Sequence, residues 1–162
     1  GGSIEVDVVK KNSKYKECKD LINWVLESEN VNQYNEIKKH KSFYNECLNH
    51  KKLLKKLLVT LKKQNKKVVG YGASTKGNVL LQFCGINSKI INNIAEVNKY
   101  KFNRYTPGSK IKIVSEKSVK LKKPDYMLVL PWHFKDYIVK RERNFLKNGG
   151  KLIFPLPEIE IV

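Results

Sequence analysis

The segment Lys66–Asn78, with the sequence KKVVGYGASTKGN, indicates the fold more clearly than any other part of the chain. Val68 and Val69 are typical of the end of a buried β-strand, and residues 78–82 are typical of the first turns of a helix. The glycines between them let the backbone turn tightly and approach a ligand closely. A helix that begins after such a turn presents unpaired N–H groups and the positive end of its dipole, which suits a phosphate. The segment therefore predicts an anion-binding loop at the edge of an α/β sheet.

The glycine spacing of this loop matches neither of two well-known phosphate-binding fingerprints. A dinucleotide-binding loop has its third glycine three positions after the second, where this chain has Thr75. A Walker loop ends in Gly-Lys followed by Ser or Thr, whereas here Lys76 precedes Gly77. The spacing leaves two interpretations open: an anion-binding loop, or a strand-to-helix turn whose glycines serve backbone geometry alone.

Length and composition restrict the class of protein. The chain has 162 residues, enough for one domain with a sizeable core. It has no apolar run long enough to span a membrane and no basic segment leading into an apolar run near its start. Cys18, Cys47 and Cys84 lie far apart and form neither a metal-ligand spacing nor a disulfide framework. We expect a cytoplasmic protein with no membrane partner and no metal site.

The net charge of +18 raises the possibility of nucleic-acid binding. However, only three of the 33 basic residues are arginine, the residue most used for base recognition. The lysines occur in every segment beside many asparagines, as expected from a general compositional bias and a solvated surface. Nucleic acid is therefore not an expected partner.

The chain before the loop is predicted to be mostly helical. Residues 4–9 alternate apolar and polar side chains, as a half-buried strand does, and residues 14–28 fit a helix. Residues 31–64 show a long helical pattern, possibly interrupted. We expect residues 1–30 to be a strand and helix that link to a preceding domain, and residues 31–162 to form a Rossmann-like domain.

From Lys66 onward, strand and helix patterns alternate. The expected strands are 67–70, 90–95, 111–114, 125–130 and 151–154, and the expected helices are 77–84, 115–120 and 133–146. Alternation of this length implies right-handed βαβ units and a mostly parallel sheet flanked by helices. Ligands bind such sheets at the carboxyl ends of the strands. The loop 70–77, the loop after Ala95 and the segment 131–133 should meet at that edge.

Six short motifs occur in one order along the second part of the chain. They are GYGASTKGN (70–78), RYTPG (104–108), KPDY (123–126), LPW (130–132), GG (149–150) and PLPE (155–158). Together they resemble the C-terminal domain of the S-adenosylmethionine-dependent sugar C-methyltransferases, over roughly residues 32–162. These enzymes act on nucleotide-linked keto-sugars of deoxysugar pathways. The resemblance implies that this chain holds the nucleotide-sugar substrate.

The resemblance also implies what this chain does not contain. In the family, a zinc-binding segment and a methyl-donor domain precede this domain, and the donor domain carries the main candidates for the catalytic base. The chain has no cysteine cluster and no second glycine-rich loop before residue 66. S-adenosylmethionine and zinc are therefore expected only in upstream domains, with the methyl-donor domain as a partner. No catalytic residue is assigned here, and the isolated chain is expected to transfer no methyl group.

The sequence departs from the family pattern at several positions. Glu96 stands where Asp is expected, His133 where Asn is usual, Asn103 before Arg104 where Gly is expected, and Tyr137 after Asp136 where an acidic residue is expected. Glu96 could bind a ribose, as the acidic residue of a dinucleotide fold does, or pair with nearby lysines at a loop start. His133 could contact a phosphate or donate a proton, or could replace Asn as a polar cap.

The candidate substrate-binding residues come from the three predicted loops, because hydroxyl, N–H and aromatic groups suit phosphates and rings. They are Tyr71, Gly72, Ala73, Ser74, Thr75, Lys76, Asn78, Glu96, Arg104, Tyr105, Trp132 and His133. Two alternatives remain: a nucleotide-sugar reductase using NAD(P), and a nucleotide-binding module without catalysis. A reductase is disfavoured by the glycine spacing and by the lack of a tyrosine-lysine pair at the separation that short-chain reductases use.

Overall fold

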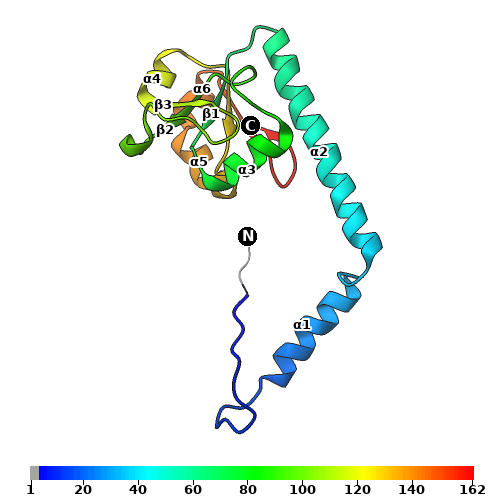
Figure 1. The fold of residues 1–162 in the computed structure, drawn as a ribbon. Helices are drawn as coiled ribbons and strands as arrows, with labels where there is room; N and C mark the ends of the chain where they lie inside the picture. Colours follow the sequence, from blue (N-terminus) through cyan, green and yellow to red (C-terminus); the bar gives the residue numbers. More distant parts are fainter. Residues whose placement is uncertain (1–3) are drawn as a thin grey trace. The chain divides into compact units, whose positions relative to one another are not determined.

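The computed structural model describes residues 4–162, which fall into two compact units, one ending at residue 45 and the other comprising residues 46–162. Helix α1 (Lys19–Val31) belongs to the first unit, and helix α2 (Ile37–Lys63) begins there and continues into the second (Figure 1). The predicted 31–64 helix is thus interrupted at its start, because a turn occupies residues 32–35. No described helix is both long and apolar enough to cross a bilayer.

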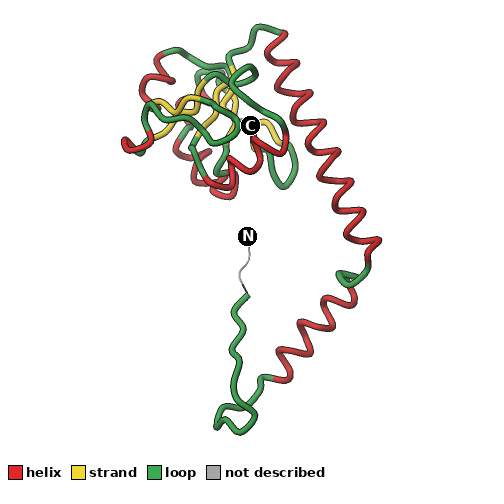
Figure 2. Tube along the Cα trace, in the orientation of Figure 1, coloured by secondary structure: helices red, strands yellow, loops and turns green. Residues whose placement is uncertain are grey.

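The predicted strand at residues 4–9 is wrong. These residues pair with no other strand of the described chain, and Ile4, Val6 and Val8 are at least 74% exposed. A strand needs backbone partners and a surface to cover its apolar face, and the alternating pattern alone supplies neither. Figure 2 shows strands only in the second unit.

The second unit is built on a six-stranded sheet in the order β3-β2-β1-β4-β5-β6. Its strands are β1 (Val68–Tyr71), β2 (Asn93–Glu96), β3 (Lys112–Ser115), β4 (Tyr126–Val129), β5 (Lys151–Phe154) and β6 (Glu160–Ile161). The first five are parallel, and β6 pairs antiparallel with β5. This arrangement confirms the predicted Rossmann-like α/β fold. Strands β2 and β3 are added on one side of β1, and β4 and β5 on the other, so the order of the strands reverses between β1 and β4. The carboxyl ends of these two parallel strands therefore form the expected ligand-binding crevice.

Helices cover both faces of the sheet. One core cluster packs Leu54, Leu58 and Leu61 of α2 and the apolar side of α3 (Thr75–Cys84) against the sheet. The other cluster contains Val119 of α4 (Glu116–Leu121) and Ile138 of α5 (Lys135–Arg141). Because both faces are buried, the central strands β4 and β5 have almost continuous apolar sequences, as in other parallel sheets.

Two details differ from the sequence prediction. The predicted helix 133–146 is divided into a 3₁₀ turn (Trp132–Phe134), α5 and α6 (Arg143–Lys147). The division falls at Glu142, whose carboxylate is buried in a polar network described below. Strand β6 was not predicted, because two residues after a proline-rich segment carry no periodic pattern.

Candidate functional site

The three glycines of the loop after β1 are required by the packing around them. A Cβ atom on Gly70 would lie 2.6 Å from Ile94, and one on Gly77 would lie 2.6 Å from Leu130. Gly72 has φ +78°, and its Cβ would lie 2.8 Å from Cδ of Pro131. The backbone therefore needs glycine at all three positions whether or not a ligand binds. Of the two interpretations of the spacing, the geometric one accounts for these glycines in full.

The first turn of α3 nevertheless keeps two free backbone donors. Ser74 caps the helix, because its Oγ accepts the Gly77 N–H at 3.0 Å. The N–H groups of Gly72 and Ser74 are bonded to Ala95 O and Gly72 O. The N–H groups of Thr75 and Lys76 have no acceptor among the described residues. These two donors point along the positive end of the helix dipole, where an anion is stabilised.

Glu96, at the end of β2, fixes the position of the loop after β1. Its Oε2 accepts the Ala73 N–H at 3.0 Å and the Lys101 ammonium at 3.3 Å, and its Oε1 accepts the N–H groups of Val97 and Asn98 at 2.8 and 3.0 Å. Lys101 also donates to the Ala73 carbonyl at 2.8 Å, so both polar groups of Ala73 are bound.

These contacts decide which interpretation of Glu96 the structure favours. A carboxylate has about four lone-pair positions, and four donors of the protein already use those of Glu96. The side chain is also buried, with 8% of the residue exposed. The structure thus favours pairing of Glu96 with its own loops over binding of a ribose hydroxyl.

A cleft of about 280 Å³ opens where the loops after β1, β2 and β4 meet. Five of the predicted residues line it, namely Tyr71, Gly72, Ala73, Ser74 and Glu96. Phe134 and Tyr137 line the opposite side, and 57% and 66% of their surfaces are exposed. Sequence analysis named Tyr137 only as a departure from the family pattern and did not name Phe134. The sequence signal that was available is their spacing of three residues at the start of a helix, which places both side chains on the same side of that helix.

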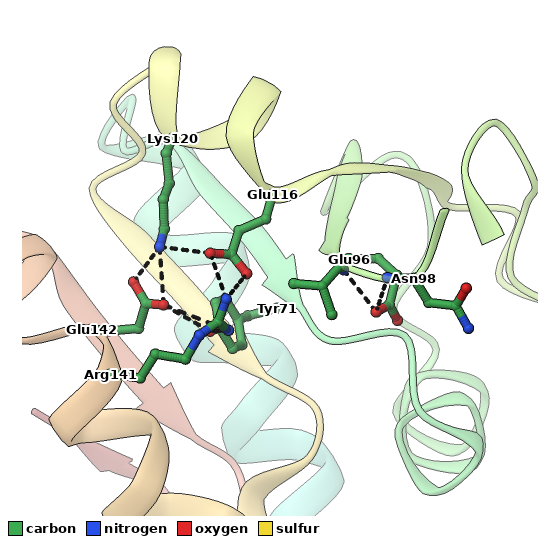
Figure 3. A network of polar contacts seen from close by, with 8 residues as sticks. Tyr71, Glu96, Asn98, Glu116, Lys120, Arg141 and Glu142 are labelled. Carbon is green, nitrogen blue, oxygen red and sulfur yellow. Dashed lines mark hydrogen bonds and ion pairs between the residues drawn. The ribbon is translucent and has the colours of Figure 1, made fainter. Parts of the chain in front are cut away.

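Five polar side chains form one network beside the cleft, and Tyr71, Glu116 and Arg141 of this network also line the cleft (Figure 3). Tyr71 donates its hydroxyl to Oε1 of Glu142 at 2.8 Å and accepts a hydrogen bond from Arg141. Arg141 also binds both oxygens of Glu116, at 2.9 and 2.7 Å. Lys120 donates to Glu116 and Glu142, each at 2.7 Å. Two cations and two carboxylates cancel, and the network joins the end of β1 to α4 and α5.

Burial and hydrogen bonding set the protonation of this network. Burial, reinforced by the hydrogen bond to Glu142, raises the pKa of the Tyr71 phenol, which stays protonated. Burial works to raise the pKa of Glu116, but hydrogen bonds from Lys120 and Arg141 outweigh it and lower that pKa overall. In the same way, backbone N–H groups and Lys101 lower the pKa of Glu96 against the effect of burial. Both carboxylates are thus charged at neutral pH.

The other predicted residues do not line the cleft. Arg104 is exposed and donates a hydrogen bond from Nε to the Tyr100 carbonyl. Tyr105 is 61% exposed, and its backbone forms an isolated antiparallel β-bridge with that of Lys112. Trp132 is half-buried and packs against both core clusters. His133 is exposed, and the centroid of its ring lies 4.3 Å from the centroid of the Phe134 ring. Thr75, Lys76 and Asn78 belong to the first turn of α3, next to the cleft residue Ser74.

Comparison with known proteins identifies the family to which this fold belongs. The family model of the C-methyltransferase C-terminal domain matches residues 1–157, almost the whole chain. The chain belongs to this family. One curated relative, the C-methyltransferase NovU of Streptomyces niveus, is 39% identical over 97 residues. The aligned stretch covers 60% of this chain and 23% of NovU, so the matched part corresponds to less than a quarter of that enzyme. The family assignment confirms the resemblance inferred from the six motifs.

Proposed function

We propose that this chain holds a nucleotide-linked keto-sugar for C-methylation by a separate methyl-donor domain. The observation that carries the proposal is the cleft between the loops after β1, β2 and β4, in a chain that belongs to a C-methyltransferase domain family. This position is the crevice in which open parallel sheets bind ligands. The donor domain would bind S-adenosylmethionine and supply the catalytic base.

The cleft and the first turn of α3 offer two chemically different surfaces. All four charged side chains that line the cleft are paired within the protein: Lys101 with Glu96, and Arg141 with Glu116. The remaining surface carries Pro131, Phe134 and Tyr137, which suits a flat or weakly polar ring. Ser74 lines the cleft and also caps α3, so the free N–H groups of Thr75 and Lys76, the next two residues, lie beside the cleft. We assign the ring of the ligand to the cleft and its diphosphate to the start of α3.

Isothermal titration of the chain with thymidine and uridine diphosphate sugars tests this proposal. We expect one of them to bind below millimolar concentration. Lys76→Ala should weaken binding through the phosphate, and Tyr137→Ala should weaken it through the ring. Lys147→Ala, an exposed lysine of α6 outside the cleft, is the matched control. Absence of binding by both sugars, together with no effect of Lys76→Ala, would refute the assignment.

Two further measurements separate this function from its alternatives. A methyltransferase assay with S-adenosylmethionine and a 4-keto nucleotide sugar should be silent for the isolated chain and recover when a methyl-donor domain is added in trans. Turnover by the chain alone would contradict the proposal that this chain holds the substrate while a separate domain transfers the methyl group. Fluorescence titration with reduced nicotinamide cofactors should show no micromolar binding, since Glu96 has no free lone-pair position for a ribose.

A further inference from the structure

A second cavity, of about 440 Å³, lies at the opposite edge of the sheet from the cleft. The first residues of β1 and β2 line it, together with the segment that connects α2 to β1 and the end of α4. The strands are parallel, so these amino ends lie about 13 Å from the carboxyl edge, the length of a four-residue strand. The cavity is therefore separate from the proposed nucleotide-sugar site, and we name it the amino-edge cavity.

The charges that line this cavity are all of one sign. Lys62, Lys66, Lys67 and Lys122 line it, and no aspartate or glutamate does. None of these four lysines forms an ion pair within residues 4–162. The cleft is different, because each of its charged side chains has an opposite partner. The Lys62 ammonium donates to the Lys89 carbonyl, and the carboxylate of Asp125, beside the lining, accepts the Lys67 N–H at 2.7 Å. Several lysines along one concave surface, with no carboxylate among the lining residues, still favour an anion there.

Uncharged donors supplement the lysines. The side-chain amides of Asn65, Asn92 and Asn93 line the cavity and make no hydrogen bond to the part of the chain that the structure describes. The negative end of α2 is also compensated locally. The Leu61 carbonyl accepts the Lys66 N–H at 3.0 Å, and the Lys62 carbonyl accepts the Asn65 N–H at 3.0 Å. The Leu61 and Lys62 carbonyls at this end of the helix are thus already used.

Apart from Ser118, the rest of the lining is apolar. Val68, Val69, Val114 and Val119 contribute to it, from β1, β3 and α4. The volume lies within the range of small-molecule sites, which is roughly 300–1,000 Å³. A concave site of this size with an apolar part and a cationic part fits a small molecule better than the extended backbone of a nucleic acid.

We propose that the amino-edge cavity binds a small phosphorylated ligand, with an oligophosphate on the lysines and a ring on the valines. The proposal is independent of the function proposed above, since the two sites share no lining residue. It assigns a role to part of the positive charge that sequence analysis attributed to composition alone.

The test follows amide resonances of ¹⁵N-labelled chain during titration with three probes: sodium tripolyphosphate, adenosine triphosphate and adenosine. Tripolyphosphate should shift the resonances of Val69, Asn93 and Ser118 at the amino edge. Adenosine triphosphate should bind there more tightly than tripolyphosphate, and adenosine more weakly than either. Shifts confined to residues 72–78 would report the proposed nucleotide-sugar site and would overturn the second site.

A pair of double variants distinguishes a site from general charge. The variant Lys66→Gln/Lys122→Gln removes two lining ammoniums and should weaken tripolyphosphate binding about tenfold, the loss expected for one charge-assisted hydrogen bond. The variant Lys52→Gln/Lys56→Gln removes the same charge from exposed positions of α2 that do not line the cavity, and should change the dissociation constant less than about twofold. Equal losses in both variants would refute the proposal. Adenosine triphosphate that binds no tighter than tripolyphosphate would refute its assignment of a ring to the valines.

Discussion

Replacing Glu96 by glutamine should loosen the loop after β1 while changing the shape of the side chain very little. Glu96 accepts four hydrogen bonds, two on each carboxylate oxygen. A glutamine keeps one acceptor oxygen but places an NH₂ group at the other position. Whichever way the amide is oriented, its NH₂ group faces two N–H donors of the protein. The substitution therefore removes two accepted hydrogen bonds and leaves at least one backbone N–H without a partner.

The contacts give an order of magnitude for the loss of stability. We expect the NH₂ group at the Oε2 position, because there only one backbone N–H, that of Ala73, loses its acceptor, whereas at the Oε1 position those of Val97 and Asn98 both would. The Ala73 N–H bond is partly buried, and losing a bond from a buried donor costs about 1–2 kcal/mol. The Lys101 side chain is 43% exposed, so solvent screening limits its contribution to about 0.5 kcal/mol. We expect Glu96→Gln to lower the free energy of unfolding by about 2 kcal/mol. With a urea dependence of about 2 kcal/mol per molar, the midpoint should fall by about 1 M.

Two measurements check this expectation. Urea unfolding can be followed by the fluorescence of Trp132 in a Trp24→Phe background, since Trp24 is 67% exposed and its replacement removes an interfering signal. Hydrogen exchange of the Ala73 amide reports the loop directly, and Glu96→Gln should accelerate it more than it accelerates exchange in β5. Glu158→Gln, at an exposed position, is the matched control. A midpoint change no larger than that of the control, with unchanged protection of Ala73, would refute the role of Glu96.

Three further predictions follow from the same site. Gly72→Ala should destabilise the chain by about 2–3 kcal/mol, because the new Cβ atom would clash with Pro131 and the backbone at this position is left-handed. Gly149→Ala is the control, since its backbone is also left-handed, at φ +84°, but its Cβ atom would meet no other atom. It should cost only about 1–2 kcal/mol in the same urea assay. Arg141→Lys should lower stability by about 1 kcal/mol in thermal unfolding, whereas Arg143→Lys should have no effect. The lowered pKa values of Glu96 and Glu116 stabilise the fold above the unfolded pKa of about 4.3, and this stabilisation is lost as pH falls through their folded values. The urea midpoint should therefore decrease as the pH is lowered below about 4.5. In Glu96→Gln this decrease with pH should be less steep than in the unchanged chain.

The fold was predictable because local patterns and the sheet agree. The mostly buried β4 and β5 have almost continuous apolar sequences, and the glycines at 70, 72 and 77 mark the turn between β1 and α3. The strand expected at residues 4–9 shows the limit of such patterns. An alternating sequence indicates which face would be buried, but it does not provide the neighbouring strand that makes burial possible.

The site was predictable only in part, for a similar reason. The glycines identify the loop after β1 in the sequence, and Tyr71 to Ser74 of this loop do line the cleft, while substrate binding by them stays a prediction. The role of Glu96 required the partner distances, because its position in sequence suits a ribose ligand and a loop anchor equally. Phe134, on the opposite wall, belongs to a different βα unit, and only the order of strands brings it to the cleft.

Arg141 makes a set of contacts that a lysine at the same position could not make together. Lysine supplies 30 of the 33 basic residues, so an arginine is uncommon in this chain. Arg141 binds both oxygens of Glu116 and the hydroxyl of Tyr71 at once, which requires the planar fork of a guanidinium. Lys120 connects Glu116 and Glu142 with a single ammonium, for which lysine is sufficient. At position 141 the arginine therefore supplies geometry that a lysine lacks. The two edges of this sheet also differ in their charged side chains. Those that line the cleft form ion pairs with one another, whereas those that line the amino-edge cavity are all lysines.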